Sequence, residues 1–159
     1  SVASPNRLGL GMGEPAVWAM WLVPMVVVAL PVLFVAAGGR DVQAHYPEMK
    51  VADWRRARFR SALSWAAYLF GYELLFRGVM LFQLREAWGD WPAIAAVTGL
   101  YVVVHFDKGL GETVMSIPMG FVFGALALFS GGVWAPWLLH TVIAVSSENF
   151  AVMRRPVSA

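Results

Sequence analysis

The chain has 159 residues, of which 59% are hydrophobic and 14% charged, and its formal net charge at pH 7 is +2. With a mean hydropathy of +0.63 it is too apolar for a soluble domain of this size. The small positive charge comes from loops rather than from a basic patch, so no nucleic-acid partner is expected. Cysteine is absent, which excludes disulfide frameworks, thiol catalysis and thiolate metal sites.

The N-terminal third predicts a tail, a first transmembrane span and a basic loop. Residues 1–14 hold one Arg and no basic segment before the first apolar run, so no cleaved signal peptide is expected. Residues 15–37 are long enough to cross a bilayer core of about 30 Å, although Pro24 and Pro31 should bend this span. Residues 38–60 predict a loop that ends in an amphipathic helix on an anionic membrane surface; a stop-transfer charge cluster is an equal alternative. The basic residues of this loop are Arg40, Lys50, Arg55, Arg56, Arg58 and Arg60.

Residues 61–153 are expected to form a core of four further spans, followed by a C-terminal tail at residues 154–159. The expected spans are residues 61–88, 91–106, 113–129 and 133–153. The apolar runs therefore predict an all-α, polytopic transmembrane helical bundle of about five spans. Gly120-Phe-Val-Phe-Gly124 has a small-xxx-small spacing that lets a neighbouring helix approach closely.

Lysine and arginine counting predicts the orientation of the bundle. The first loop holds six, the loop at residues 107–112 one and the C-terminal segment two, whereas the other side holds only Arg7 and Arg85. We therefore expect the N-terminus outside and the C-terminus in the cytoplasm, in a bacterial inner membrane. Six tryptophans then form a belt at the outer interface: Trp18, Trp21, Trp88, Trp91, Trp134 and Trp137.

A few polar side chains lie within the expected spans and are the candidates for chemistry. They are Glu73, Arg77, His105 and His140, with Tyr72, Tyr101 and Asn149 as lesser members. Burying a charge in a bilayer costs at least about 2.5 to 3.5 kcal/mol, so such groups need partners. Glu73 and Arg77 share one helix face at a spacing of four residues. Together with the two histidines, this predicts one convergent site in which the Glu activates a water and a His supports a developing oxyanion.

Three other interpretations of these residues stay open. The four groups could form a buried polar knot that fixes helix register without chemistry. Two His and one Glu match a catalytic zinc set, but no local ligand spacing supports it and Arg77 opposes a cation, so no metal is predicted. No cofactor is predicted either, although His105 or His140 could ligate a chlorin or a haem.

Three separated motifs resemble the CPBP family, also called Abi, which comprises CAAX prenyl endopeptidases and bacteriocin-processing membrane proteins. The motifs are Tyr72-Glu-Leu-Leu-Phe-Arg-Gly78, Tyr101-Val-Val-Val-His105 and Trp134-Ala-Pro-Trp-Leu-Leu-His140, and the resemblance covers residues 68–150. It implies an all-helical membrane bundle. In active members it implies an intramembrane endopeptidase with a glutamate-activated water, acting on a membrane or prenylated peptide substrate.

The chain departs from the family pattern at two positions. The first motif of the family has two adjacent acids, and the first of them is Tyr72 here; the third motif has an Asn where this chain has Ala144. A tyrosine hydroxyl is a poor water-activating base at neutral pH. We therefore predict a catalytically impaired, non-catalytic or scaffolding subunit that packs in the lipid bilayer against other integral membrane proteins. The alternative is an active endopeptidase using Glu73, Arg77, His105 and His140, although straight helices would place His105, Glu73 and His140 at different depths.

Overall fold

A computed structural model describes residues 8–48 and 53–155 and shows an all-α fold, with no strand in these ranges. This confirms the predicted fold class. The helical elements are α1 (Pro15–Ala36), α2 (Arg40–His45), α3 (Trp54–Glu73), the π-helix η2 (Leu74–Met80), α4 (Leu81–Trp88), α5 (Asp90–Val103), the short 3₁₀ helix η3 (Phe106–Lys108), α6 (Leu110–Ser130) and α7 (Trp134–Met153).

Two of the described helices, α1 and α6, are each long and apolar enough to cross a membrane, and α5 is a shorter apolar helix. α3 differs because its first two turns carry four arginines, at positions 55, 56, 58 and 60. These turns continue without a break into the apolar part of α3, so the basic segment begins the same helix. Lys50 lies outside the described residues. The number of spans and the domain boundaries stay predictions.

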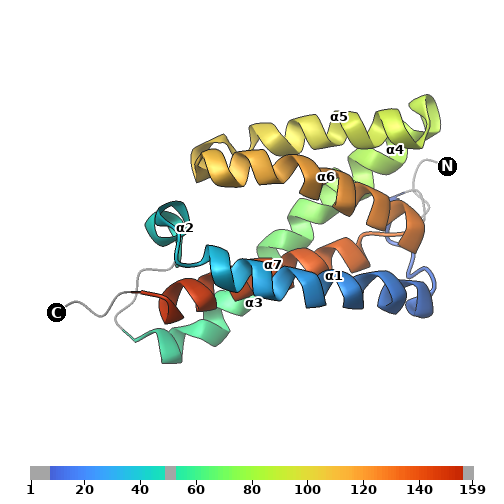
Figure 1. Cartoon of the computed structure of the whole chain (residues 1–159). Helices are drawn as coiled ribbons and strands as arrows, with labels where there is room; N and C mark the ends of the chain where they lie inside the picture. The colour runs from blue at the N-terminus through green and yellow to red at the C-terminus, as the bar shows by residue number, and fades with distance from the viewer. Residues whose placement is uncertain (1–7, 49–52, 156–159) are drawn as a thin grey trace.

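The helices form two groups joined by the long run of α3, η2 and α4 (Figure 1). α5 and α6 lie side by side as one pair, whereas α1 and α3 both pack along α7. The α3–η2–α4 run crosses from the second group to the first. Any residue at the middle of this run therefore meets both groups.

Close contact between α5 and α6 depends on the Gly120-x-x-x-Gly124 spacing. A Cβ added at Gly120 would lie 2.6 Å from Thr98 Cγ2, and one at Gly124 would lie 3.0 Å from Ile94 Cγ2. Both glycines are buried. The small-residue face is thus used inside the chain, against α5, and does not present a free surface to another protein.

The segment from Leu8 to Gly13 packs on the turn between α6 and α7. The amide of Val133 donates to the Gly9 carbonyl at 2.8 Å, and Trp134 Nε1 donates to the Leu10 carbonyl at 3.3 Å. A Cβ at Gly132 would lie 2.3 Å from the Gly11 carbonyl oxygen, so only glycine permits this approach. The described part of the N-terminal tail is therefore built into the bundle.

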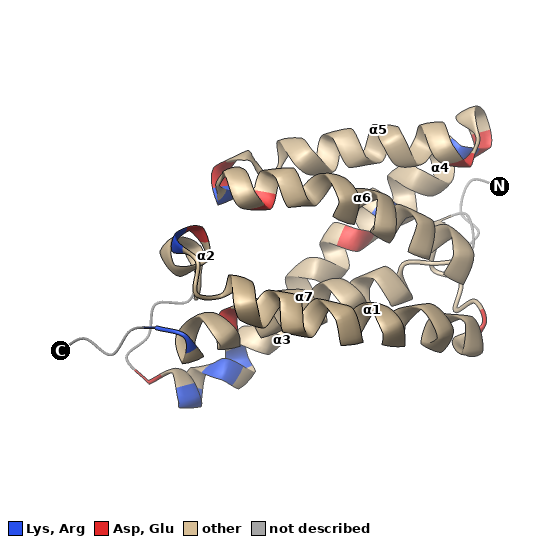
Figure 2. Cartoon of the chain, in the orientation of Figure 1, with Lys and Arg blue, Asp and Glu red and all other residues tan. Residues whose placement is uncertain are grey.

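Charged residues gather at the ends of the bundle (Figure 2). The exception is the middle of the α3–η2–α4 run, where acidic and basic ribbon segments lie between the two helix groups. Glu73 and Arg77 have side chains that are 0% exposed there. The fold therefore places one ion pair at the junction of its two halves.

Candidate functional site

The junction is formed by the π-helix η2, in which the backbone turn is wider than in an α-helix. Glu73 is the last residue of α3, and η2 begins at the next residue and carries Arg77. π-helical turns are rare and are frequently found at functional sites. Gly78 follows Arg77, and a Cβ there would lie 2.7 Å from the Leu8 carbonyl oxygen. The absence of a side chain at Gly78 therefore lets the N-terminal segment contact the widened turn.

Three of the four predicted site residues are in direct contact. Glu73 Oε1 lies 3.4 Å from Arg77 Nη1 and 2.6 Å from His140 Nδ1. Glu73 and Arg77 are completely buried, and the side chain of His140 is 12% exposed. The contacts join the α3–η2 junction to α7. The predicted pairing of Glu73 with Arg77 and its convergence with His140 are both present in the structure.

The guanidinium of Arg77 is surrounded by aromatic rings from three elements. Its Cζ lies 4.3 Å from the ring centre of Tyr101, 5.2 Å from that of Phe123 and 5.8 Å from that of Phe76. Such contacts stabilise a desolvated cation by about 2 kcal/mol in the favourable cases. Tyr101 belongs to α5 and Phe123 to α6. Arg77 therefore links the α5–α6 pair to the rest of the bundle.

His105 is next to this cluster but joins it through Tyr101. Its Nδ1 lies 2.8 Å from the Tyr101 carbonyl oxygen, and its ring centre lies 4.3 Å from that of Tyr101. The Tyr101 ring is in turn 6.2 Å from the His140 ring. Tyr101 thus lies between the two histidines.

The estimate that Glu73 and His140 would lie at different depths was wrong. His140 is the seventh residue of α7, which places it about 9 Å along the helix from the first residue, at 1.5 Å per residue. α3 and α7 pack against each other in opposite directions, since Ser61 and Glu148 also meet across them. The level of His140 on α7 therefore coincides with the end of α3, where Glu73 lies.

At the position of the missing first acid, the aromatic ring of Tyr72 packs into the cluster. It stacks on Phe76 with ring centres 4.6 Å apart, and it meets Tyr101 and His140 edge-on at 5.9 and 5.8 Å. Ala144, one turn after His140, is buried at 5% exposure. The two departures from the family pattern thus lie next to Glu73 and one turn after His140, and both put a less polar side chain where the family has a polar one.

The site retains polar atoms that the protein itself does not satisfy. Within residues 8–48 and 53–155, Glu73 Oε2, Arg77 Nε, Arg77 Nη2 and the Tyr72 hydroxyl are buried without a hydrogen-bond partner. Such groups could bind a ligand carbonyl or a water molecule. In the same ranges no three His, Asp or Glu side chains come together as a metal-binding group. Ligation of a chlorin or a haem by His105 or His140 stays an open alternative.

One buried carboxylate was missed by the sequence analysis. Glu148 lies in α7 within the expected fifth span and is 1% exposed. Its carboxylate accepts hydrogen bonds from the Glu48 amide, at 2.9 Å, and from the Ser61 hydroxyl. Counting every acid inside the expected spans would have found it. Asn149 is not part of the Glu73 cluster, because its Oδ1 accepts from Trp54 Nε1 at 3.1 Å.

Comparison with models of protein families identifies the family of the chain that carries this cluster. A family model described as "Type II CAAX prenyl endopeptidase Rce1-like" matches residues 54–146, which is more than half of the chain. The chain belongs to this family. No curated protein and no solved structure was found to match it.

Membership confirms the resemblance to the CPBP family, of which the Rce1-like endopeptidases are a part. The matched range contains all three motifs with Glu73, Arg77, His105 and His140. Rce1-like proteins are integral membrane proteins, and the apolar helices of this chain fit a lipid bilayer environment. The chain is therefore a CAAX-protease-like membrane protein.

Proposed function

We propose that this Rce1-like protein is catalytically impaired and acts as a non-catalytic, scaffolding subunit of a membrane protein assembly. The observation that carries the proposal is the state of Glu73, the acid that remains. Its carboxylate is fully buried and shares Oε1 between Arg77 and His140. A carboxylate held in this way anchors helices, whereas a general base must reach the proton that it removes.

The surroundings of Glu73 support the same conclusion. Tyr72 stands where the family has its first acid, and its ring contacts Phe76, Tyr101 and His140. Ala144 has no donor that could replace the missing Asn of the third motif. Loss of one oxyanion donor typically lowers a rate by about 10² to 10³, and loss of the base lowers it further.

The arrangement in the membrane is part of the proposal. We infer an N-terminus outside, a C-terminus in the cytoplasm and a bacterial inner membrane, supported by the basic residues at the start of α3 and after α7. Partners are expected to be other integral membrane proteins. Helix α1 packs along α7 on one side, but none of its residues is buried, so its other side is a candidate contact surface.

Purification in mild detergent tests the subunit role. The expected result is a stoichiometric complex with one or more other membrane proteins, identified by mass spectrometry of the intact assembly. A chain that elutes alone as a monomer, after the same mild extraction, would overturn the proposal.

A second candidate function is an active intramembrane endopeptidase that uses Glu73, Arg77, His105 and His140. It is favoured by the 2.6 Å contact of Glu73 with His140 and by the unpartnered Glu73 Oε2 within the described residues. The test is hydrolysis of a prenylated peptide by the purified protein. Under the scaffolding proposal the wild-type chain is inactive. Hydrolysis that Glu73→Gln abolishes, and that Glu14→Gln in the exposed segment before α1 leaves intact, would establish the second candidate instead.

A further inference from the structure

The arginine directly after α7, Arg154, is held against the end of α1. Its Cζ lies 5.1 Å from the ring centre of Phe34, in the last turn of α1. Phe34 meets Phe150 of α7 edge-on, with ring centres 5.4 Å apart. The guanidinium also lies close to the backbone of Gly38, because a Cβ there would lie 3.1 Å from Arg154 Nη2. The exposed Arg154 side chain therefore has a defined position.

The N–H groups of this guanidinium have no acceptor in the described part of the chain. An arginine side chain carries five such donors in a rigid, planar fork. Within residues 8–48 and 53–155, those of Arg154 make no hydrogen bond and no ion pair; only its backbone amide donates, to the Phe150 carbonyl at 2.9 Å. A basic residue at a helix C-terminus can bind the last carbonyls, but Arg154 does not. A positioned guanidinium with free donors is suited to a phosphate group, which accepts two parallel hydrogen bonds from it.

Arg40 adds a second positive charge near the end of α1. It lies two residues after Gly38 at the start of α2, is exposed, and has no ion pair in the part of the chain that the structure describes. The next residue, Asp41, lies close to α6, because a Cβ at Gly111 would lie 3.3 Å from its Oδ2. Figure 2 shows basic ribbon segments in α2 and directly after α7 at this end of the bundle. Among the described residues, no carboxylate pairs with Arg40 or Arg154.

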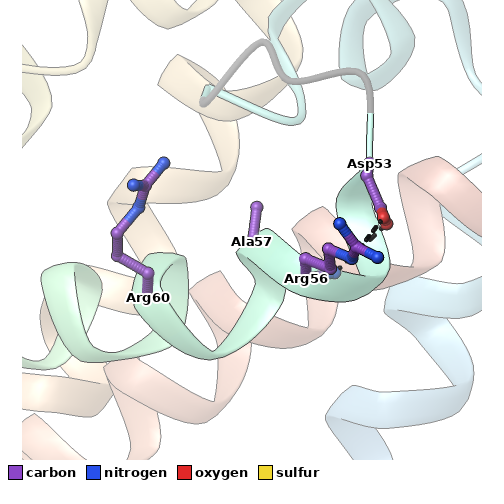
Figure 3. A pocket seen from close by; sticks show the side chains of 4 residues that line it. All are labelled: Asp53, Arg56, Ala57 and Arg60. Carbon is purple, nitrogen blue, oxygen red and sulfur yellow. Dashed lines mark hydrogen bonds and ion pairs between the residues drawn. The ribbon is translucent and has the colours of Figure 1, made fainter.

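Other arginines at this end already have acceptors within the chain. Figure 3 shows Arg56 turned toward Asp53, and Arg56 Nε lies 3.2 Å from Asp53 Oδ2. Arg155 Nη2 donates to the Tyr46 carbonyl at 3.3 Å. These contacts distinguish Arg56 and Arg155 from Arg154, whose guanidinium is positioned but unpaired within the described residues.

An exposed apolar strip of α1 leads to Arg154. Its members recur at spacings of three, four and seven residues, which places them on one side of the helix. They are Met20, Val23, Val27 and Phe34, with exposed fractions between 38% and 63%. From Val27 to Phe34 the strip rises about 10 Å along the helix axis. An acyl chain could follow this strip while its headgroup reaches the guanidinium.

We propose that the end of α1 binds an anionic phospholipid. Its phosphate accepts hydrogen bonds from Arg154 and is attracted by Arg40, and an acyl chain lies along the apolar strip of α1. Basic residues at the end of a transmembrane helix favour anionic lipids in this way. The carboxylate of a partner protein would satisfy the arginines but would leave the strip unused. The proposal does not rest on the scaffolding role, because a lipid can bind here whether or not the chain has protein partners.

Native mass spectrometry of the detergent-solubilised chain, with lipid titrated in, tests this site. The probes are phosphatidylglycerol, phosphatidylcholine with the same acyl chains, and free glycerol phosphate. We expect phosphatidylglycerol to bind about tenfold more tightly than phosphatidylcholine, because its headgroup has a net negative charge. Glycerol phosphate should bind at least about tenfold more weakly than phosphatidylglycerol, because it has no acyl chain to cover the strip. Equal binding of the two lipids, or glycerol phosphate binding as tightly as phosphatidylglycerol, would overturn the proposal.

Two variants that remove the same charge show whether the lipid binds at the end of α1. Arg154→Gln should lower the affinity for phosphatidylglycerol about tenfold. Arg58→Gln, which removes an exposed arginine of α3, should change this affinity less than about twofold. Equal losses in the two variants would indicate a general attraction to the basic end of the bundle and would contradict a site at Arg154.

A further variant leaves every charge in place. Phe34→Leu keeps the arginines and the apolar strip but removes the ring that positions Arg154. It should lower the affinity for phosphatidylglycerol about threefold, the size expected for an exposed contact between a cation and an aromatic ring. Phe59→Leu, at a phenylalanine of α3 that is 79% exposed, is the matched control and should bind as the wild type does. Wild-type affinity in Phe34→Leu would overturn the assignment of the phosphate to Arg154.

Discussion

Replacing Arg77 by Met is expected to destabilise the bundle by about 3 to 5 kcal/mol, the usual cost of removing one partner of a buried ion pair. Arg77 and Glu73 are both 0% exposed. Without the guanidinium, the Glu73 carboxylate keeps only its contact with His140. The variant also loses the packing of the cation on the Tyr101 and Phe123 rings.

Replacing the other partner of the ion pair, by Glu73→Gln, should lower the free energy of unfolding by less. Arg77 keeps its contact with the Tyr101 ring at 4.3 Å, and a desolvated contact of this kind stabilises a cation by about 2 kcal/mol. The free energy of unfolding of Glu73→Gln is therefore expected to be lower than that of the wild type by about 2 to 3 kcal/mol. In the double variant no charge of the pair is left buried, so its loss should be smaller than the sum of the single losses. The coupling energy is expected at about 2 to 3 kcal/mol.

Equilibrium unfolding in mixed micelles of dodecylmaltoside and dodecyl sulfate, followed by far-UV circular dichroism, measures these free energies. Glu14→Gln is the control, because this carboxylate is exposed and should change stability by less than about 0.5 kcal/mol. Single losses below about 1 kcal/mol, or losses that add without coupling, would refute the view that the ion pair holds the two helix groups together.

Three further results are expected. Gly120→Ala should destabilise the chain by about 1 to 3 kcal/mol, because its Cβ would lie 2.6 Å from Thr98 Cγ2. Trp137→Phe should lower stability by about 0.5 to 1.5 kcal/mol, because its Nε1 donates to a backbone carbonyl of α3 at 2.8 Å. Tyr46 lies in the loop after α2, and burial raises the pKa of its hydroxyl above the ordinary value. The unfolded chain then loses this proton first, so stability should be unaffected below about pH 10 and should fall above it, and Tyr46→Phe should reduce that fall.

Each of these expectations has its own control. Gly99→Ala adds the same methyl group to α5 at a position where no other element lies within 4 Å of the new Cβ, and it should be neutral or slightly stabilising. Trp88→Phe tests an exposed tryptophan and should change little. For Tyr46, unfolding is measured at several alkaline pH values, and identical curves for wild type and variant would contradict the assignment.

The sequence was sufficient to predict the helical segments and the contact of Glu73 with Arg77, because helical spacing determines which side chains share a face. It was also sufficient to predict that His140 lies near Glu73, because few polar side chains fall within the expected spans. The π-helix was not predictable, since Leu74 to Met80 has no composition that distinguishes a wider turn from an α-helix. The depths of Glu73 and His140 were misjudged for a different reason. Their relative depth depends on how α3 and α7 pack, and that packing is set by contacts distant in sequence.

The sequence also could not predict which helix packs on the face that carries Gly120 and Gly124. The spacing indicates that a helix approaches closely, but it does not distinguish a helix of the same chain from a helix of another protein. In the structure Thr98 and Ile94 of α5 occupy that face. A contact with another protein would therefore use another surface, such as the side of α1 that does not pack along α7.

Of the two acids of the first motif, the chain has the second, Glu73, but has Tyr72 in place of the first. This difference follows from the packing around the two positions. Replacing Glu73 leaves Arg77 buried beside aromatic rings without a counter-ion and lowers stability, so the fold favours a carboxylate at this position. Position 72 differs, because no buried cation there requires a counter-ion. A second carboxylate at position 72 would instead add a negative charge next to Glu73 and would have to be desolvated. The Tyr72 ring instead packs against Phe76, Tyr101 and His140. Where proteolysis is not required, stability alone therefore favours keeping Glu73 and replacing the acid before it.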